Sequence, residues 1–302
     1  MTDVIIIGAG TAGLSAAIYA CRLGKSVLVF EKEIIGGQIV YSNRVENYPG
    51  IKEIGGADFA SGLFEQATDL GAEIRLERVN EIKDLGSFKT VVTDGGSYDC
   101  KAVIIACGVK SKRLGAKGEE EFIGKGVSYC AVCDGAFYKG KDVLVVGGGN
   151  TALQDALLLS SYCRKVYLVH RRSAFRGEQK SAEALKAKEN VSFVLDSVIT
   201  KIGGEDSVSF AEIENVKTKE RSTVSVSGVF VAVGQKPDNE AFKSVADLDE
   251  YGFIIAGEDC RTKTDGIFAI CQSHKLVSHI FYTTTVLHRM ANFVFLYLNN
   301  GR

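Results

Sequence analysis

Two cysteines, Cys130 and Cys133, are separated by two residues and followed directly by Asp134. A pair with this spacing can be half of a metal site, a structural disulfide or a redox dithiol. A zinc site needs two further ligands, and the remaining cysteines are scattered without a second pair of this spacing. We therefore expect no metal and favour a redox dithiol, with the Asp134 carboxyl group as general acid and base for a leaving thiolate.

A glycine-rich pattern occurs twice, and each copy follows an aliphatic run that predicts a buried strand. Such strand, turn and helix units hold a dinucleotide pyrophosphate on backbone N–H groups at the helix N-terminus. Two copies in one chain therefore predict two dinucleotides. The pattern residues are Gly8, Gly10 and Gly13 in the first copy, and Gly147, Gly149 and Ala152 in the second.

The residues that follow the second strand of each copy differ in charge. Glu31 ends this strand in the first copy, where a carboxylate accepts hydrogen bonds from ribose hydroxyls, as in FAD or NAD. In the second copy the equivalent position begins a basic cluster, which favours the 2′-phosphate of NADPH. The members of this cluster are His170, Arg171, Arg172 and Arg176.

A nicotinamide and a dithiol each exchange two electrons, but they do so efficiently only through a mediator, and a flavin is suited to that role. The combination of two dinucleotide units with a cysteine pair therefore predicts one electron path. It runs from NADPH through FAD to the Cys130 and Cys133 dithiol and on to an external disulfide.

The elements that must position these residues indicate an α/β protein with two Rossmann-like, three-layer dinucleotide-binding domains, the second inserted in the first. Alternating residues at 88–93 and 97–105 predict an antiparallel hairpin between the two copies. We place the FAD-binding domain at residues 1–112 and 242–302, and the NADPH-binding domain with the cysteine pair at 113–241.

Bulk composition excludes several classes of protein. The 302 residues carry a formal net charge of −1, which gives no electrostatic reason to expect nucleic acid or an anionic membrane as a partner. The first strand-like run begins at Val4, which leaves no room for a signal peptide, and no apolar run is long enough to span a bilayer. We therefore expect a cytoplasmic protein.

Taken together, these motifs resemble those of the low-molecular-weight, bacterial-type thioredoxin reductases over roughly residues 1–270. Besides the two glycine patterns, Glu31, the cysteine pair and the basic cluster, the resemblance rests on two short segments at 36–38 and 46–50. It implies that Gly36, Gly37, Gln38 and Asn47 contact FAD. It also implies that Cys133 faces the flavin and that Cys130 attacks the disulfide of thioredoxin. Proteins of this family are homodimers whose NADPH domain rotates between flavin and thioredoxin.

The chain departs from the family pattern near its C-terminus. Gln272 stands where the family has an aspartate that binds FAD, and His279 and Ile280 stand where it has an Arg-Gln pair. An amide matches only part of the acceptor capacity of a carboxylate. Two alternatives therefore stay open, namely a ferredoxin-dependent flavin thioredoxin reductase and a dimeric scaffold without flavin. The second glycine pattern and the basic cluster speak against the ferredoxin-dependent class.

Overall fold

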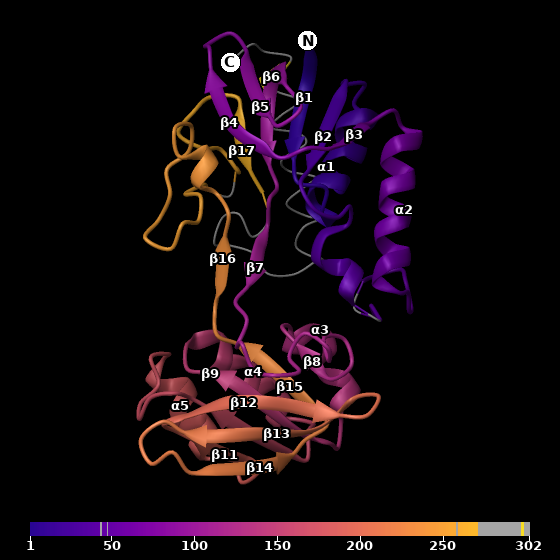
Figure 1. The fold of residues 1–302 in the computed structure, drawn as a ribbon. Helices are drawn as coiled ribbons and strands as arrows, with labels where there is room; N and C mark the ends of the chain where they lie inside the picture. The colour runs from indigo at the N-terminus through magenta and orange to yellow at the C-terminus, as the bar shows by residue number, and fades with distance from the viewer. Residues whose placement is uncertain (43, 47, 258, 271–296, 299–302) are drawn as a thin grey trace. The chain divides into compact units, whose positions relative to one another are not determined.

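The computed structural model describes residues 1–42, 44–46, 48–257, 259–270 and 297–298. The chain forms two compact units, the first of residues 1–110 and 236–302 and the second of residues 111–235 (Figure 1). The sequence-based boundaries lay after residues 112 and 241, whereas the units separate after residues 110 and 235. The predicted FAD contact Asn47 and the three divergent residues Gln272, His279 and Ile280 lie outside the described residues.

A seven-stranded sheet forms the centre of the first unit, with the order β3-β2-β1-β6-β5-β4 and with β17 paired to β6. Its strands are β1 (Thr2–Ile7), β2 (Val27–Glu31), β3 (Glu73–Leu76), β4 (Val79–Asp84), β5 (Lys89–Thr93), β6 (Ser97–Ile105) and β17 (Ile267–Ala269). β1, β2, β3, β6 and β17 are parallel, and the hairpin predicted from the alternating residues is confirmed as the antiparallel pair β5 and β6. Because β5 pairs with the first half of β6 and β17 with its second half, the long strand β6 joins the hairpin to the parallel sheet.

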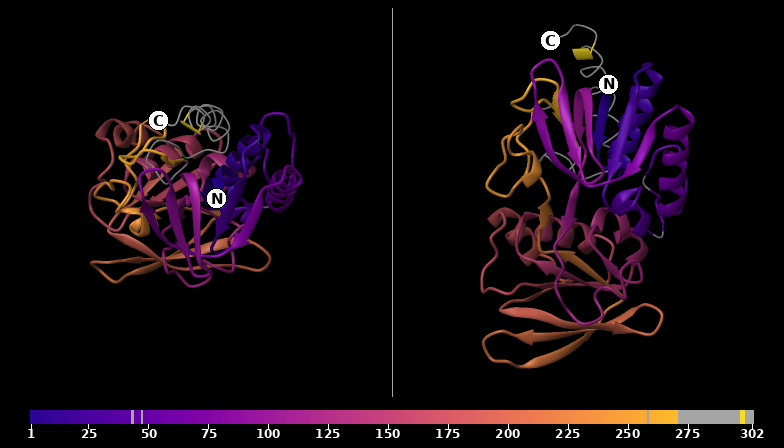
Figure 2. Two further views of the ribbon diagram at one scale, coloured as in Figure 1. Left: turned by 90° about the horizontal axis from the view of Figure 1, so that it is seen from above. Right: turned by 45° about the horizontal axis from the view of Figure 1, so that its top comes forward.

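Residues of β1 alternate between two cores, because successive side chains of a strand point to opposite faces. Val4 and Ile6 pack in the core that contains residues of the helices, whereas Ile5 and Ile7 pack in the core on the opposite face. α1 and α2 pack against each other beside β1 and β2 (Figures 1 and 2). The helical elements of this unit include α1 (Thr11–Arg22), the 3₁₀ helix η1 (Gly37–Tyr41), α2 (Gly56–Asp69) and the 3₁₀ helix η3 (Glu240–Phe242).

A parallel five-stranded sheet with the order β11-β10-β9-β15-β8 forms the centre of the second unit, and a separate antiparallel sheet has the order β12-β13-β14. The parallel strands are β8 (Val127–Ser128), β9 (Asp142–Gly147), β10 (Lys165–Val169), β11 (Val191–Val194) and β15 (Gly228–Ala232). The antiparallel strands are β12 (Ser197–Gly204), β13 (Val208–Asn215) and β14 (Arg221–Ser225). The helical elements are α3 (Ala131–Asp134), the 3₁₀ helix η2 (Gly135–Tyr138), α4 (Asn150–Ser160) and α5 (Gln179–Lys186).

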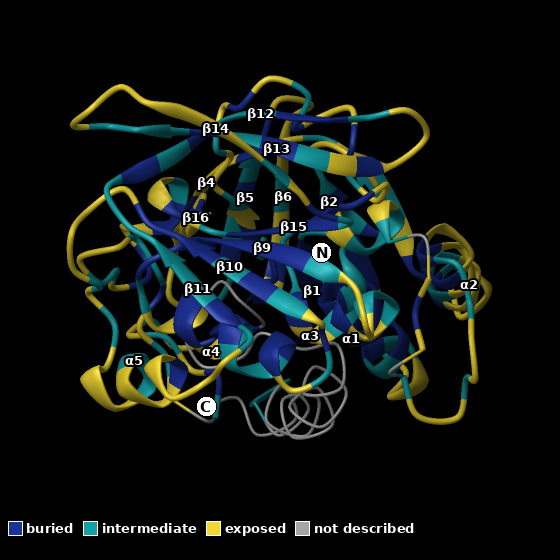
Figure 3. Ribbon diagram, turned by 90° about the horizontal axis from the view of Figure 1, so that it is seen from below, coloured by how far each residue is buried: buried dark blue, intermediate teal, exposed yellow. Residues whose placement is uncertain are grey.

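The second unit therefore has three layers. Val143 and Val145 of β9 pack against α4 and α5, whereas Leu144 and Val146 pack against β12 and β13. Figure 3 shows β9 and β10 largely buried and α5 largely exposed. The predicted α/β class with two Rossmann-like sheets is confirmed. Among the described helices, none is both long and apolar enough to cross a membrane.

The chain passes between the units twice, and the two crossing segments pair with each other. β7 (Val109–Ser111) and β16 (Gln235–Pro237) form a two-stranded sheet, and Lys112 N donates to Gly234 O at 3.0 Å. Because each crossing satisfies backbone groups of the other, the unit boundaries fall inside short strands and not inside irregular linkers.

Candidate active site

The first glycine turn lies between β1 and α1 and brings Gly8, Gly10 and Gly13 together. Gly8 has a φ of +105° and donates its N–H to Phe30 O at 2.7 Å, and a Cβ here would lie 2.4 Å from Ala106 O. Gly10 is the N-cap residue of α1, whose first N–H groups are therefore available to an anion. A Cβ on Gly13 would lie 1.8 Å from Gly8 O, so the helix approaches the turn more closely than any larger residue permits.

Glu31 stabilises this same turn. Its Oε2 accepts a hydrogen bond from Ala9 N at 2.8 Å, and its Oε1 accepts one from Glu33 N at 2.8 Å. A carboxylate has about four acceptor positions, so two remain for ligand hydroxyls. Glu31 therefore has a structural role that the sequence did not indicate, in addition to its predicted ribose contact.

Gly36 and Gly37 also lie against the first glycine turn. Gly36 N donates to Ala9 O at 2.7 Å, and a Cβ on Gly37 would lie 3.2 Å from the Cα of Gly10. The neighbouring Gln38 donates its side-chain amide to Val109 O in β7. The structure thus places Gly36 and Gly37 against the first glycine turn, although the sequence alone identifies them only as turn residues, and it ties Gln38 to β7.

The second glycine turn connects β9 to α4. Gly147 has a φ of +155°, and a Cβ on it would lie 2.3 Å from Ala232 O. Gly149 is the N-cap residue of α4, and the space beside it is open, since a Cβ built there would meet no atom of other parts of the described chain within 4 Å. Ala152 is fully buried in the first turn of the helix. This open space beside a helix N-terminus fits a bound pyrophosphate.

His170 differs from the three arginines with which the sequence grouped it. Its side chain is buried beneath the second glycine turn, and a Cβ on Gly148 would lie 2.2 Å from its Cε1. The ring also stacks on Phe175, with the centroids 5.4 Å apart. Burial, together with the nearby arginines, lowers the pKa of His170, so the ring supports the turn in its neutral form.

The exposed members of the basic cluster belong to a loop that is hydrogen-bonded to the second glycine turn. Arg176 N donates to Gly148 O at 2.7 Å, and Glu178 N donates to the side chain of Asn150 at 2.7 Å. The side chains of Arg171, Arg172 and Arg176 are exposed and form no salt bridge with any described residue. The guanidinium groups are therefore available to an anionic ligand beside the turn.

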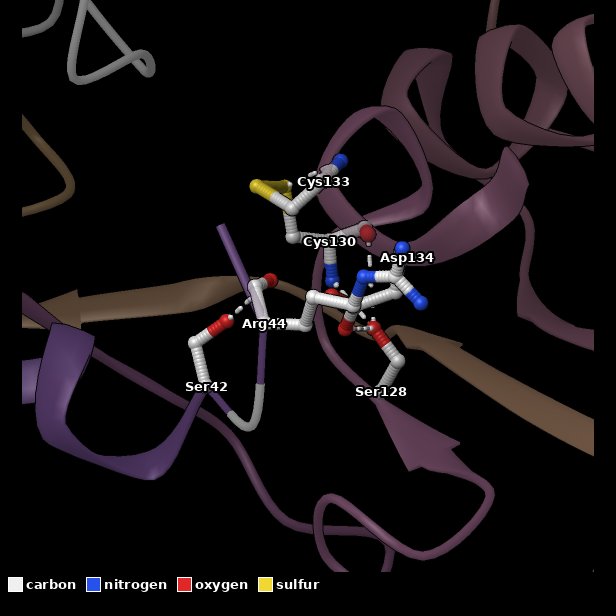
Figure 4. The surroundings of a disulfide bond; sticks show 6 residues. All are labelled: Ser42, Arg44, Ser128, Cys130, Cys133 and Asp134. Atoms are coloured by element: carbon white, nitrogen blue, oxygen red, sulfur yellow. Dashed lines mark hydrogen bonds between the residues drawn. A yellow bond between two sulfur atoms is a disulfide. The ribbon is translucent and has the colours of Figure 1, made fainter. Parts of the chain in front are cut away.

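A disulfide bond joins Cys130 and Cys133 at the start of α3, with the Cα atoms 5.3 Å apart (Figure 4). Cys130 is the N-cap residue of this short helix, and its Sγ accepts a hydrogen bond from Cys133 N at 3.2 Å. Both cysteines are partly exposed. An accessible disulfide of this kind can exchange with an external thiol or disulfide.

Asp134 follows the disulfide and is hydrogen-bonded to Ser128, a residue that the sequence motifs did not indicate. Ser128 Oγ donates to Asp134 Oδ2 at 2.6 Å and accepts from Cys130 N at 3.1 Å (Figure 4). Burial raises the pKa of Asp134, and the hydrogen bond from Ser128 opposes this increase. A carboxyl group with a raised pKa is suited to donate a proton to a leaving thiolate.

A buried carboxylate fixes the segment that leads to Cys130. Glu119 is only 2% exposed, and it accepts hydrogen bonds from Leu114 N at 2.9 Å, Gly115 N at 2.8 Å and the Tyr129 hydroxyl group at 2.7 Å. The Arg113 guanidinium group donates to the same tyrosine oxygen at 2.6 Å. Burial, partly offset by Arg113, raises the pKa of Tyr129 to about 12, so this hydroxyl group keeps its proton.

The predicted site residues therefore form three groups. The first glycine turn with Glu31 and 36–38 is in the first unit, and the second glycine turn with its arginine loop is in the second. The disulfide with Asp134 is also in the second unit. The described residues contain no cluster of three or more His, Cys, Asp or Glu side chains that could hold a metal ion.

Comparisons with known proteins identify relatives over most of the chain. Residues 2–275 match the pyridine nucleotide-disulphide oxidoreductase family. A thioredoxin reductase of Mycolicibacterium smegmatis is 40% identical over 281 residues, which cover 92% of this chain and 89% of that protein. A 34.2 kDa protein in the rubredoxin operon of Clostridium pasteurianum is 41% identical over 268 residues, covering 88% of this chain and 87% of that protein.

A solved structure has the same fold over nearly the whole chain. The crystal structure of thioredoxin reductase from Streptococcus pyogenes superposes with a TM-score of 0.95 and is 39% identical in sequence, with 99% of each chain covered.

Proposed function

The chain belongs to the pyridine nucleotide-disulphide oxidoreductase family, and we propose that it is an NADPH-dependent flavoprotein that reduces the disulfide of thioredoxin. One observation carries this proposal: a partly exposed disulfide lies in the same unit as a dinucleotide turn flanked by exposed arginines. The thioredoxin reductases among the relatives support the choice of substrate.

FAD and NADPH fit different turns. Gly8, Gly10, Gly13, Glu31 and the segment 36–38 would hold FAD, because a helix N-terminus and a carboxylate meet at a cradle that side chains would fill. The open turn around Gly149 and the arginine loop would hold NADPH. When bound, these groups supply the two-electron transfer that side chains alone cannot perform.

The chain's own residues carry out the disulfide interchange. In the reduced form, the Cys130 thiolate attacks one sulfur of the external disulfide, so that a mixed disulfide forms and the external S–S bond breaks. Asp134 gives its proton to the departing thiolate. Asp134 then takes the proton of the Cys133 thiol, and the resulting thiolate attacks the Cys130 sulfur, which restores the internal disulfide. Asp134 returns that proton to the second departing thiolate. Two electrons pass from the dithiol to the substrate, which leaves as two thiols.

Two further features complete the proposal. We expect the chain to act as a homodimer, as the family resemblance implies. The exposed arginines beside the second glycine turn favour NADPH over ferredoxin as the electron donor, because ferredoxin offers no 2′-phosphate for them to bind.

The test replaces the attacking cysteine. Cys130→Ser should abolish NADPH-driven reduction of thioredoxin while NADPH still bleaches the visible flavin band under anaerobic conditions. Cys21→Ser, which changes a cysteine outside the disulfide, should leave both activities unchanged.

The same titration separates the alternatives. A yellow wild-type protein that NADPH does not bleach would favour a ferredoxin donor, and a colourless protein would favour the flavin-free scaffold. Loss of flavin bleaching in Cys130→Ser would contradict the roles given to the two cysteines.

A further inference from the structure

We propose that Ser128 is a positioning residue for the disulfide interchange. Its hydroxyl group donates a hydrogen bond to Asp134 when the carboxyl group is ionised and accepts one from it when the carboxyl group is protonated. This inference rests on the proposed disulfide reductase function. It goes beyond that function because it assigns a role to a residue outside the cysteine motif.

The position of Ser128 is fixed by the sheet. It is the last residue of β8, where it pairs with Phe230 of the neighbouring strand β15, and it is only 5% exposed. The chain then turns through Cys130 into α3, which returns Asp134 to the serine side chain (Figure 4). The serine hydroxyl group thus lies between the acid residue and the backbone of the first cysteine.

This hydroxyl group has one proton and two acceptors within reach. Asp134 Oδ2 lies 2.6 Å from Ser128 Oγ, and the carbonyl oxygen of Cys130 lies 3.3 Å from it. When Asp134 is ionised, the hydroxyl proton points to the carboxylate, since a charged acceptor forms the stronger bond. When Asp134 is protonated, its own proton can point to Ser128 Oγ, and the serine proton can rotate to the Cys130 carbonyl group.

A partly buried acid that must both give and regain a proton needs a hydrogen-bond partner in both protonation states. Burial disfavours the ionised carboxylate, so loss of the donor would shift Asp134 further toward its protonated form. Among the described residues, Tyr138 also interacts electrostatically with Asp134. Burial first and then Asp134 raise the pKa of Tyr138 to about 12, so its hydroxyl group stays neutral. Ser128 is thus the donor that permits the ionised form.

Asp134 and Ser128 then account for the position of the transferred proton at each step. Asp134 gives its proton to the sulfur that leaves when the mixed disulfide forms, and Ser128 rotates its proton from the Cys130 carbonyl group to the new carboxylate. Asp134 regains a proton from the Cys133 thiol before the second attack, and from solvent when the dithiol is formed again, and Ser128 rotates back each time. No covalent bond of Ser128 is made or broken.

The test is Ser128→Ala in the full-length protein loaded with FAD, assayed against pH. The maximal rate of thioredoxin reduction should fall roughly tenfold, because the orienting hydrogen bond to a charged group is lost. The descending limb of the pH profile should move to higher pH, since loss of a donor to the carboxylate raises the pKa of Asp134 further. NADPH-driven reduction of ferricyanide, which takes electrons from the flavin directly, should stay unchanged.

Three further variants distinguish this role from a structural one. Ser128→Thr keeps the hydroxyl group and should restore much of the rate. Ser160→Ala removes another buried serine hydroxyl group of the same unit, which donates only to Leu157 O, and should change neither activity. Starting from Asp134→Asn, the additional Ser128→Ala change should cause no further shift of the limb, because the two residues act as one unit.

The outcomes separate cleanly. An unchanged pH limb in Ser128→Ala, or an equal loss of thioredoxin and ferricyanide activities, would overturn the role of Ser128. A wild-type protein that reduces a small aromatic disulfide but not thioredoxin would contradict the proposed substrate instead. The serine variants are then compared with the small disulfide as substrate. The same lower maximal rate and the same movement of the descending pH limb are expected for Ser128→Ala.

Discussion

The two glycine turns share a backbone plan, but different side chains support them at equivalent positions. In the first unit, Glu31 accepts a hydrogen bond from Ala9 N at 2.8 Å. In the second unit, the equivalent of Glu31 is His170, and its ring lies where a side chain on Gly148, the equivalent of Ala9, would be. An alanine therefore fits beside the carboxylate, whereas the imidazole ring requires a glycine.

In the first turn of each helix the difference is reversed, with glycine in the first unit and alanine in the second. Gly13 in α1 leaves no space for a Cβ, because the carbonyl oxygen of Gly8 would lie 1.8 Å away. Its equivalent in α4 is Ala152, whose methyl group is fully buried. The third position of the glycine pattern thus reports how closely a helix approaches its own turn, and the two turns differ in this respect.

The largest expected effect is at the close helix contact. Gly13→Ala should reduce the free energy of unfolding by about 3 kcal/mol and release FAD, because the new methyl group meets backbone that cannot move aside. Ala152→Gly is the matched control in the second turn and should cost only about 1 kcal/mol through helix propensity. Chemical denaturation with a flavin readout measures both, and equal losses would contradict the difference between the turns.

A smaller effect is expected for coenzyme choice. Changing Arg171 and Arg172 together to alanine should raise the KM for NADPH roughly 10- to 100-fold, because two charge-assisted bonds to the 2′-phosphate are lost. The KM for NADH should change little, because NADH has no such phosphate. Arg221→Ala, an exposed arginine of β14, is the control and should affect neither coenzyme. Parallel increases for NADPH and NADH would refute the phosphate contact.

The smallest expected effect concerns the ring beneath the second turn. Gly148→Ala should cost about 1–2 kcal/mol of stability, because the His170 ring must move away from the added methyl group. Adding His170→Ala should recover part of this loss, and the double-mutant cycle measured by thermal unfolding gives the coupling. Ala9→Gly is the counterpart in the first turn, where no ring is displaced. Strict additivity of the two changes at 148 and 170 would show that the contact carries no energy.

Much of the site could be predicted because its signals are local in the sequence. Gly8 and Gly147 follow aliphatic strands directly, so the strand, turn and helix units are encoded in short segments, and both are present in the structure. The spacing of Cys130 and Cys133 likewise places two thiols on one turn of chain, and the structure joins them in a disulfide. Fold class and the main redox pair followed from such patterns.

Other roles depend on contacts that no local pattern reveals. Sequence reasoning placed His170 in the phosphate-binding cluster, and only the structure shows its ring buried beneath Gly148, where burial and the neighbouring arginines disfavour its charge. The same holds for Glu119, because no sequence motif indicates the hydrogen bonds that it accepts from Leu114, Gly115 and Tyr129.

The sequence by itself determined the two dinucleotide units and the cysteine pair, and it predicted Asp134 as the acid residue, because these depend on residue type and short spacing. Tertiary structure decided which side chains support them. Ser128 reaches Asp134 only because β8 is fixed in the sheet and α3 turns the chain back. Such positions depend on the packing of whole elements, and a hydrogen bond between two side chains depends on distances that spacing along the chain does not specify.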